Sequence, residues 1–165
     1  MLEDLKTKYI GTPLELAQDG AAMVVKYPRS GVHNHTYGKL TPFFSALKKG
    51  KLMATRCVNP KCEENRMWLP PRADCPDCNQ PMDWVEIPNP VIGKVHTFAK
   101  VVYAGAGIEL ETPYYQIDVE LPGCCTIFKG YLASGTAKIG MKVKAGFNTK
   151  NPSNTILDIY WEPVK

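Results

Sequence analysis

The sequence has no long apolar segment. In its N-terminal part the longest apolar run is AAMVV, residues 21–25, whereas a membrane-spanning helix needs about 20 consecutive apolar residues. The first ten residues, MLEDLKTKYI, are charged and do not resemble a secretory signal. We therefore expect a soluble protein without a membrane partner, in the cytoplasm.

A strong excess of one charge is also absent. The 165 residues include 20 lysines and arginines against 16 acidic residues, for a formal net charge of +4. This charge is too small to indicate nucleic-acid binding by itself. The sequence has no internal repeat or low-complexity segment, and a hydrophobic fraction of 44% is enough for a packed core.

Cysteine is scarce, and its distribution is uneven. Of the six cysteines, four lie within residues 57–78 in the pattern C-x4-C-x12-C-x2-C. Two short turns of this kind bring four thiolates together around one tetrahedral zinc ion, and a site with four protein ligands is structural, because no coordination position stays open. Separate thiols or disulfides are the alternative, which the spacing and a reducing cytosol disfavour. The predicted zinc ligands are Cys57, Cys62, Cys75 and Cys78.

A catalytic constellation is not apparent. Two of the three histidines lie in the tripeptide HNH, residues 33–35, which we expect to be an exposed loop, and His96 lies on the outer face of a predicted strand. The pair Cys124–Cys125 follows a turn signal and has no neighbouring base that we can identify. We therefore expect no catalytic residue in this chain.

Local patterns divide the chain into three regions: an N-terminal arm, residues 1–38; a helix with the cysteine cluster, residues 39–88; and a β domain, residues 89–165. The arm contains one weak amphipathic stretch, around Leu2, Leu5 and Tyr9. The segment TPFFSALKKG, residues 41–50, predicts a short helix with Thr41 as N-cap and Gly50 as C-cap.

From residue 91 onward, apolar residues alternate with polar ones. This period predicts five strands, and in the first it places Val95, Thr97 and Ala99 on one face with Lys94, His96 and Phe98 on the other. Five short strands favour a closed OB-fold barrel over an open two-sheet sandwich, which would leave more strand edges exposed. The expected fold is thus mainly β: the arm, a short helix, a rubredoxin-like zinc ribbon and a five-stranded OB-fold barrel. The predicted strands are residues 93–103, 114–121, 125–132, 141–147 and 155–161.

Several motifs together resemble one known family. The helix ending in GKL, the RC…C and LPPRADCPDC segments, the strand GKVHTF, and TPYYQIDVEL followed by KIGMKVKAGF are similar to the zinc-ribbon/OB-fold acyl-CoA-associated family. The resemblance covers residues 41–165, and the arm is similar to that of the small subunits of benzoylsuccinyl-CoA thiolases. The first cysteine turn, with four intervening residues, is wider than the commonest pattern of the family.

The resemblance implies a non-catalytic subunit that docks on a thiolase-fold catalytic partner and helps to enclose acyl-CoA. Basic side chains beside an aromatic one suit the phosphates and the adenine of coenzyme A. The candidate coenzyme A contacts are Lys48, Lys49, Arg66, Trp68 and Arg72. Local charge balance at the zinc site, and packing of Trp68 and Trp84 between the ribbon and the barrel, are the competing interpretations. The alternative function is binding of single-stranded nucleic acid.

Overall fold

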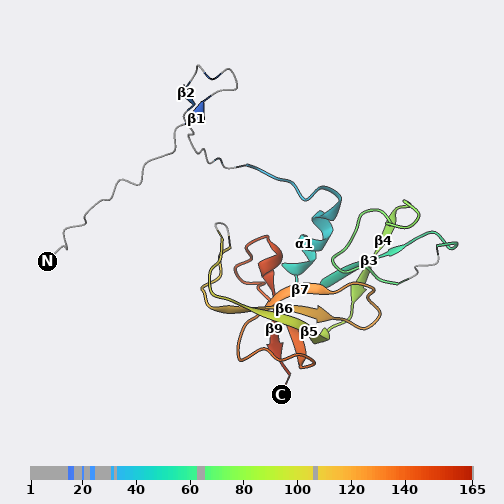
Figure 1. Ribbon diagram of the computed structural model, residues 1–165. Helices are drawn as coiled ribbons and strands as arrows, with labels where there is room; N and C mark the ends of the chain where they lie inside the picture. The colour runs from blue at the N-terminus through green and yellow to red at the C-terminus, as the bar shows by residue number, and fades with distance from the viewer. Residues whose placement is uncertain are drawn as a thin grey trace. The chain divides into compact units, whose positions relative to one another are not determined.

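The computed structural model describes residues 15–16, 20, 23–24, 31, 33–62, 66–105 and 108–164. The chain divides into two units, residues 1–35 and 36–165, and each is described by itself. In the first unit, β1 (Glu15–Leu16) and β2 (Met23–Val24) form an antiparallel pair that the sequence did not predict (Figure 1). The predicted amphipathic stretch near Tyr9 lies outside the described residues. Among the described helices, none has the length and apolar character that a membrane span requires.

The second unit begins with a short helical segment. A 3-10 turn, η1 (Gly38–Leu40), leads directly into α1 (Thr41–Leu47). The prediction of Thr41 as N-cap is wrong: Leu40 holds that position without a side-chain bond, because η1 continues into the helix and the Thr41 hydroxyl donates to the Gly38 carbonyl instead. The predicted C-cap is also displaced: Lys48 holds that position, and Gly50 follows two residues later, in the turn that ends the helix. Gly50 has φ +70°, and the amides of Gly50 and Lys51 bond the last turn of the helix as in a Schellman motif.

The cysteine region is built on one antiparallel strand pair. β3 (Leu52–Cys57) pairs with β4 (Met82–Ile87) from Leu52 opposite Ile87 to Cys57 opposite Met82. The last residue of β3 therefore lies beside the first residue of β4, and the turns that carry the cysteines meet there.

The C-terminal part is a closed five-stranded barrel (Figure 1). The strands follow one another around it in the order β5-β6-β7-β9-β8, and β8 pairs back to β5. All neighbours are antiparallel except β7 and β9, which are parallel. The predicted OB-type barrel in a mainly β fold is confirmed. Its strands are β5 (Ile92–Val101), β6 (Tyr114–Glu120), β7 (Phe128–Leu132), β8 (Lys142–Phe147) and β9 (Ile159–Pro163).

Two details of the strand prediction are wrong. A β-bulge at His96 shifts the register, so that Val95 lies opposite Val119 but Thr97 opposite Asp118. An extra residue reverses the alternation, and Phe98, not Thr97, therefore shares a face with Val95. The predicted strand 155–161 begins instead with a 3-10 turn, η2 (Ile156–Asp158), capped by the Thr155 hydroxyl; β9 starts only at Ile159.

Two glycines give aromatic rings room on the barrel strands. A Cβ at Gly130 would lie 2.6 Å from Nε1 of Trp161, the fully buried indole of the barrel core. A Cβ at Gly146 would overlap the ring of Tyr160, which lies opposite it on β9. These mid-strand glycines therefore admit side chains from β9.

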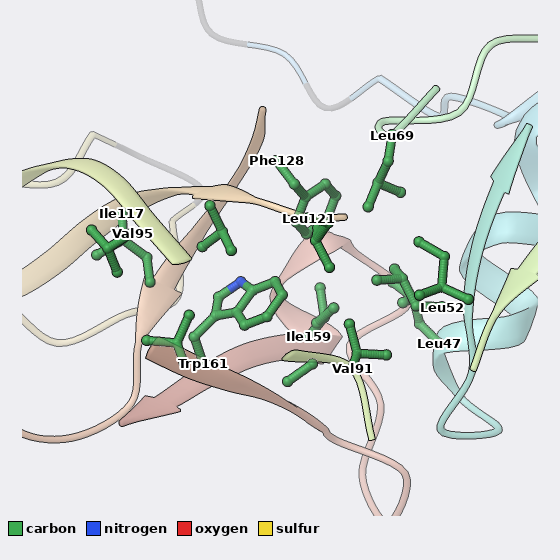
Figure 2. Packing of buried hydrophobic residues seen from close by; sticks show 14 of the residues in the cluster. Leu47, Leu52, Leu69, Val91, Val95, Ile117, Leu121, Phe128, Ile159 and Trp161 are labelled. Carbon is green, nitrogen blue, oxygen red and sulfur yellow. The ribbon is translucent and has the colours of Figure 1, made fainter. Parts of the chain in front are cut away.

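The helix, the ribbon and the barrel share one hydrophobic core. Leu47 of α1, Leu52 of β3 and Leu69 are fully buried and pack with barrel residues such as Phe128 and Ile159 (Figure 2). Removing this apolar surface from water stabilises the three parts together, at roughly 25 cal/mol per Å². The ribbon is therefore fixed on the barrel by packing as well as by the chain itself.

Candidate functional site

The four clustered cysteines converge at the end of the β3–β4 pair. Their Sγ atoms all lie within 4.8 Å of one another, with Cys57 and Cys78 3.5 Å apart and Cys62 and Cys75 3.7 Å apart. A disulfide would need sulfurs about 2.05 Å apart. Tetrahedral ligation with metal–sulfur bonds of about 2.3 Å places the sulfurs about 3.8 Å from one another. The arrangement therefore fits one metal ion and is consistent with a zinc ribbon.

Asn59 organises the wide first turn. Its backbone N–H donates to Cys57 Sγ over 3.4 Å, its carbonyl accepts from the Cys62 amide, and its side-chain oxygen accepts from the Lys61 amide. A hydrogen bond from the Asn59 side chain lowers the pKa of Cys78 to about 7. Because a metal binds the thiolate, this residue favours the ligating form. The asparagine of the sequence C-V-N-P indicates an Asx turn. The prediction of the zinc ligands rested on cysteine spacing alone and did not include this residue.

A second small cluster also contains predicted residues. The Arg72 guanidinium lies 5.1 Å from the centre of the Trp68 ring, a cation–π contact. Trp68 is half-buried against the cysteine cluster. Trp84, in contrast, packs on the main core.

Two pockets flank the segment that follows Arg72. One, of about 410 Å³, includes Leu40 and Thr126; the other, of about 300 Å³, includes Trp84. Lys39 lines the second pocket and forms an exposed ion pair with Asp74 at 3.3 Å. The sequence analysis did not single out Lys39, which has no motif of its own and reaches this place only because η1 lies beside the ribbon.

The candidate coenzyme A contacts fall into separate places. Lys48 bonds Asn154 of the β8–β9 connection over 2.8 Å, at the end of α1. Lys49 is exposed next to it, and Arg66 is exposed on the ribbon. The structure brings Trp68 and Arg72 together, whereas Lys48 contacts a different part of the molecule.

The remaining two cysteines lie where the ribbon meets the barrel. Met67 forms a parallel bridge with Cys124, and the Cys125 amide donates to the Met67 carbonyl over 2.9 Å. Beside them the Thr126 hydroxyl donates to the Leu69 carbonyl over 2.6 Å. Burial, and then the neighbouring Cys125 thiol, raise the pKa of Cys124 to about 11. The backbone of this pair therefore joins the two parts, which gives it a structural role.

The histidines lie at the surface, as predicted. His33 and His35 are exposed and in no helix or strand. His96 is exposed on β5 and its Nδ1 lies 2.6 Å from Glu120, which also pairs with Lys94 at 3.0 Å. These contacts, led by His96, lower the pKa of the Glu120 carboxyl.

Comparison with known proteins gives structural matches only. No protein-family model and no curated protein matches the chain. A Sulfolobus solfataricus protein of unknown function from the DUF35 family is similar with a TM-score of 0.56 and 22% identity, over 78% of this chain and 87% of its own. An aldolase designated Ltp2-ChsH2(DUF35) is similar with a TM-score of 0.58 and 23% identity, over 82% of this chain and 98% of its own. At these identities the likeness establishes the fold that the chain shares with DUF35 structures.

Proposed function

We propose that this chain is a non-catalytic, zinc-binding subunit of an acyl-CoA-processing complex and docks on a thiolase-type catalytic subunit. The resemblance of residues 41–165 to acyl-CoA-associated proteins supports this role. A DUF35 structure whose name joins two components, Ltp2 and ChsH2, to an aldolase activity supports a hetero-oligomer.

Zinc is the metal that the four-cysteine centre fits best. Four soft thiolates in a tetrahedron select zinc or iron, and with all positions filled by protein the ion cannot bind and activate water. When bound, zinc would hold the ribbon turns in place, and Cys57, Cys62, Cys75 and Cys78 would be its ligands. The metal would thus have a structural and not a catalytic role.

Cys124 is the wrong kind of thiol for covalent catalysis. A nucleophilic cysteine needs a lowered pKa or an adjacent base, whereas burial raises the pKa of Cys124 to about 11. This supports a catalytic site on the partner and not on this chain.

The observation that carries the docking proposal is the β5–β6 connection, residues 102–113. Two apolar side chains project from it into solvent: Val102 is 72% exposed and Tyr103 83% exposed. Ile108 and, on β5, Phe98 are also exposed large apolar residues. Large exposed apolar side chains on one loop favour an interface, and tyrosine is enriched in such contacts. We propose that this loop contacts the catalytic partner.

The candidate coenzyme A contacts would serve different parts of the ligand. Lys48 and Lys49 at the end of α1 are suited to phosphate, and the stacked pair of Trp68 and Arg72, with Arg66 on the same ribbon, to a second polar group.

Charge pairing on the barrel disfavours the nucleic-acid alternative. On the outer face of β5, Lys94 and His96 both pair with Glu120, and Lys129 of β7 pairs with Asp118 at 3.0 Å. A groove that binds single strands needs unpaired positive charge along the phosphate backbone.

The test is assembly with a thiolase-fold protein encoded beside this chain. Co-expression and size-exclusion chromatography with light scattering should yield a hetero-oligomer, and the isolated chain should show no turnover of acetoacetyl-CoA. The double variant Val102→Ser/Tyr103→Ser should weaken assembly at least about tenfold, since buried aromatic anchors dominate interfaces. Ile139→Ser is the matched control, because Ile139 is also 72% exposed but belongs to another loop. Turnover by the isolated chain, or equal effects of the two changes, would contradict the proposal.

A further inference from the structure

A pocket of about 220 Å³ lies on the outer face of the barrel. It is bounded by the β5–β6 connection through Ile108 and Leu110, by strands β6 and β7, and by η2 through Ile156 and Leu157. In OB folds, the face of the second and third strands, together with the loops between strands 1–2 and 4–5, is where ligands bind. These are the elements that line this pocket.

The walls are apolar, and the space is small. Four aliphatic side chains, those of Ile108, Leu110, Ile156 and Leu157, come from the two loops. The volume lies below the about 300–1,000 Å³ that drug-sized ligands fill. A single flat ring system suits the pocket, whereas a whole cofactor would extend out of it.

Polar side chains also line the pocket. Gln116 is half-buried and lies directly opposite Tyr131 across the β6–β7 pair, with Tyr114 two residues before it. Within the described part of the chain, the Gln116 amide and the Tyr114 hydroxyl make no hydrogen bond. A purely apolar ligand would leave both groups buried and unpaired, so the pocket favours a ring with donors and acceptors on its edge.

The loop over the pocket is held in place. The carboxylate of Asp158, fully buried, accepts the Ser153 amide at 2.6 Å and the Asn154 amide at 2.9 Å. The Tyr131 hydroxyl donates to the Leu157 carbonyl over 3.3 Å, and burial raises its pKa, which keeps the phenol neutral. The wall that η2 contributes is therefore formed before a ligand arrives, so little ordering of this wall opposes binding.

The lysines in and near the pocket are already bonded to other side chains. Lys129 lines the pocket but is paired with Asp118. Lys48 bonds Asn154, two residues before Ile156 in the same loop. Because no unpaired charge among the described residues is shown at the pocket, a neutral ring is the ligand that fits it.

We propose that this pocket binds the adenine ring of coenzyme A, with Gln116 reading the edge of the base. A glutamine amide accepts from N6 of adenine and donates to N7, a pair that guanine cannot match because it presents two acceptors there. Tyrosine rings stack on a base. The inference rests on the proposed function, since it names where the acyl-CoA of that complex would be held.

The experiment is calorimetric titration of the full-length chain. Coenzyme A and adenosine 3′,5′-bisphosphate are expected to bind with similar affinity, and guanosine 3′,5′-bisphosphate and pantetheine at least about tenfold more weakly. Gln116→Leu should weaken coenzyme A binding about tenfold. Gln80→Leu, at the exposed glutamine of the ribbon, is the matched control and should leave binding unchanged. Circular dichroism checks that both variants fold.

Three results would overturn the inference: no saturable binding of adenosine 3′,5′-bisphosphate, binding that Gln116→Leu leaves intact, or binding of an oligo(dT) strand that is as tight as that of coenzyme A. Assembly with the partner is measured separately, through Val102 and Tyr103. A chain that assembles normally but binds no coenzyme A would overturn this inference and leave the proposed function standing.

Discussion

At the scale of single residues, the four-cysteine cluster includes one thiol that solvent barely reaches. Cys75 is 1% exposed, and serine at this position would offer a hard hydroxyl to a soft ion. Cys75→Ser should therefore reduce bound zinc from one ion per chain to well below that, as measured by elemental mass spectrometry. Cys125→Ser, outside the cluster, should retain the metal; a Cys75→Ser protein with a full zinc ion would exclude our ligand set.

The raised pKa of Cys124 predicts that its thiol reacts slowly with alkylating reagents. Its pKa of about 11, against an ordinary 9.0, means about a hundredfold less thiolate at pH 8, and only the thiolate reacts with iodoacetamide. In a zinc-loaded Cys125→Ser background, peptide mapping should find Cys124 alkylated far more slowly than glutathione in the same tube. A similar rate for the two thiols would count against the buried environment.

The pH dependence of Cys124 has a defined sign. Because the folded-state pKa is raised, the folded chain keeps the proton that the unfolded chain loses. The contribution to stability is present below pH 9 and is lost as pH rises from 9.0 toward 11. Chemical denaturation of the wild type and of Cys124→Ala should therefore converge at alkaline pH.

The sequence was informative about residues where chemistry and spacing coincide. Four cysteines in two short turns predict a cluster, and the Sγ atoms of Cys57 and its three partners do lie close together. Asn59 and Gln116 could not be named in advance, because an asparagine in a turn and a glutamine in a strand are common. Their importance depends on which side chains the fold brings beside them.

At the scale of elements, the barrel depends on a missing side chain. A Cβ at Gly130 would meet Trp161 at 2.6 and 2.8 Å, and Trp161 is fully buried. Gly130→Ala should destabilise the protein by about 1–3 kcal/mol, the usual effect of overpacking. Denaturant titration measures it. Gly105→Ala is the control, since nothing lies within 4 Å of the added methyl; equal effects would contradict the packing argument.

The sequence predicted where the strands lie more reliably than which of their side chains face inward. The alternation in β6 was predicted correctly, with Ile117 and Val119 inward, since no residue interrupts its pairing. In β5 the bulge at His96 reverses the faces, and a local period of two cannot reveal an extra residue that only the partner strand defines. The apolar segment at Ile156 was also predicted to be strand, whereas it forms η2.

At the scale of the whole molecule, the shared core couples metal binding by the ribbon to the stability of the barrel. Leu47, Leu52 and Leu69 contribute to the same cluster as the barrel residues. Removal of the metal with a chelator should therefore lower the melting temperature of residues 36–165 as one transition, by about 10 °C or more. Hydrogen exchange of residues 114–132 is the local measurement. Full protection of these amides in metal-free protein would mean that the barrel is independent of the ribbon.

The strand order also sets a sequence of events during synthesis. β9 joins β7 to β8, yet it follows every other barrel strand in the chain, so the sheet cannot close until the ribosome has released residues 159–163. Until then β7 and β8 each present an open edge, the condition under which nascent chains associate wrongly. The four clustered cysteines emerge much earlier, within residues 57–78. A metal-loaded ribbon would then be the first ordered part of the nascent chain, and the barrel would close last.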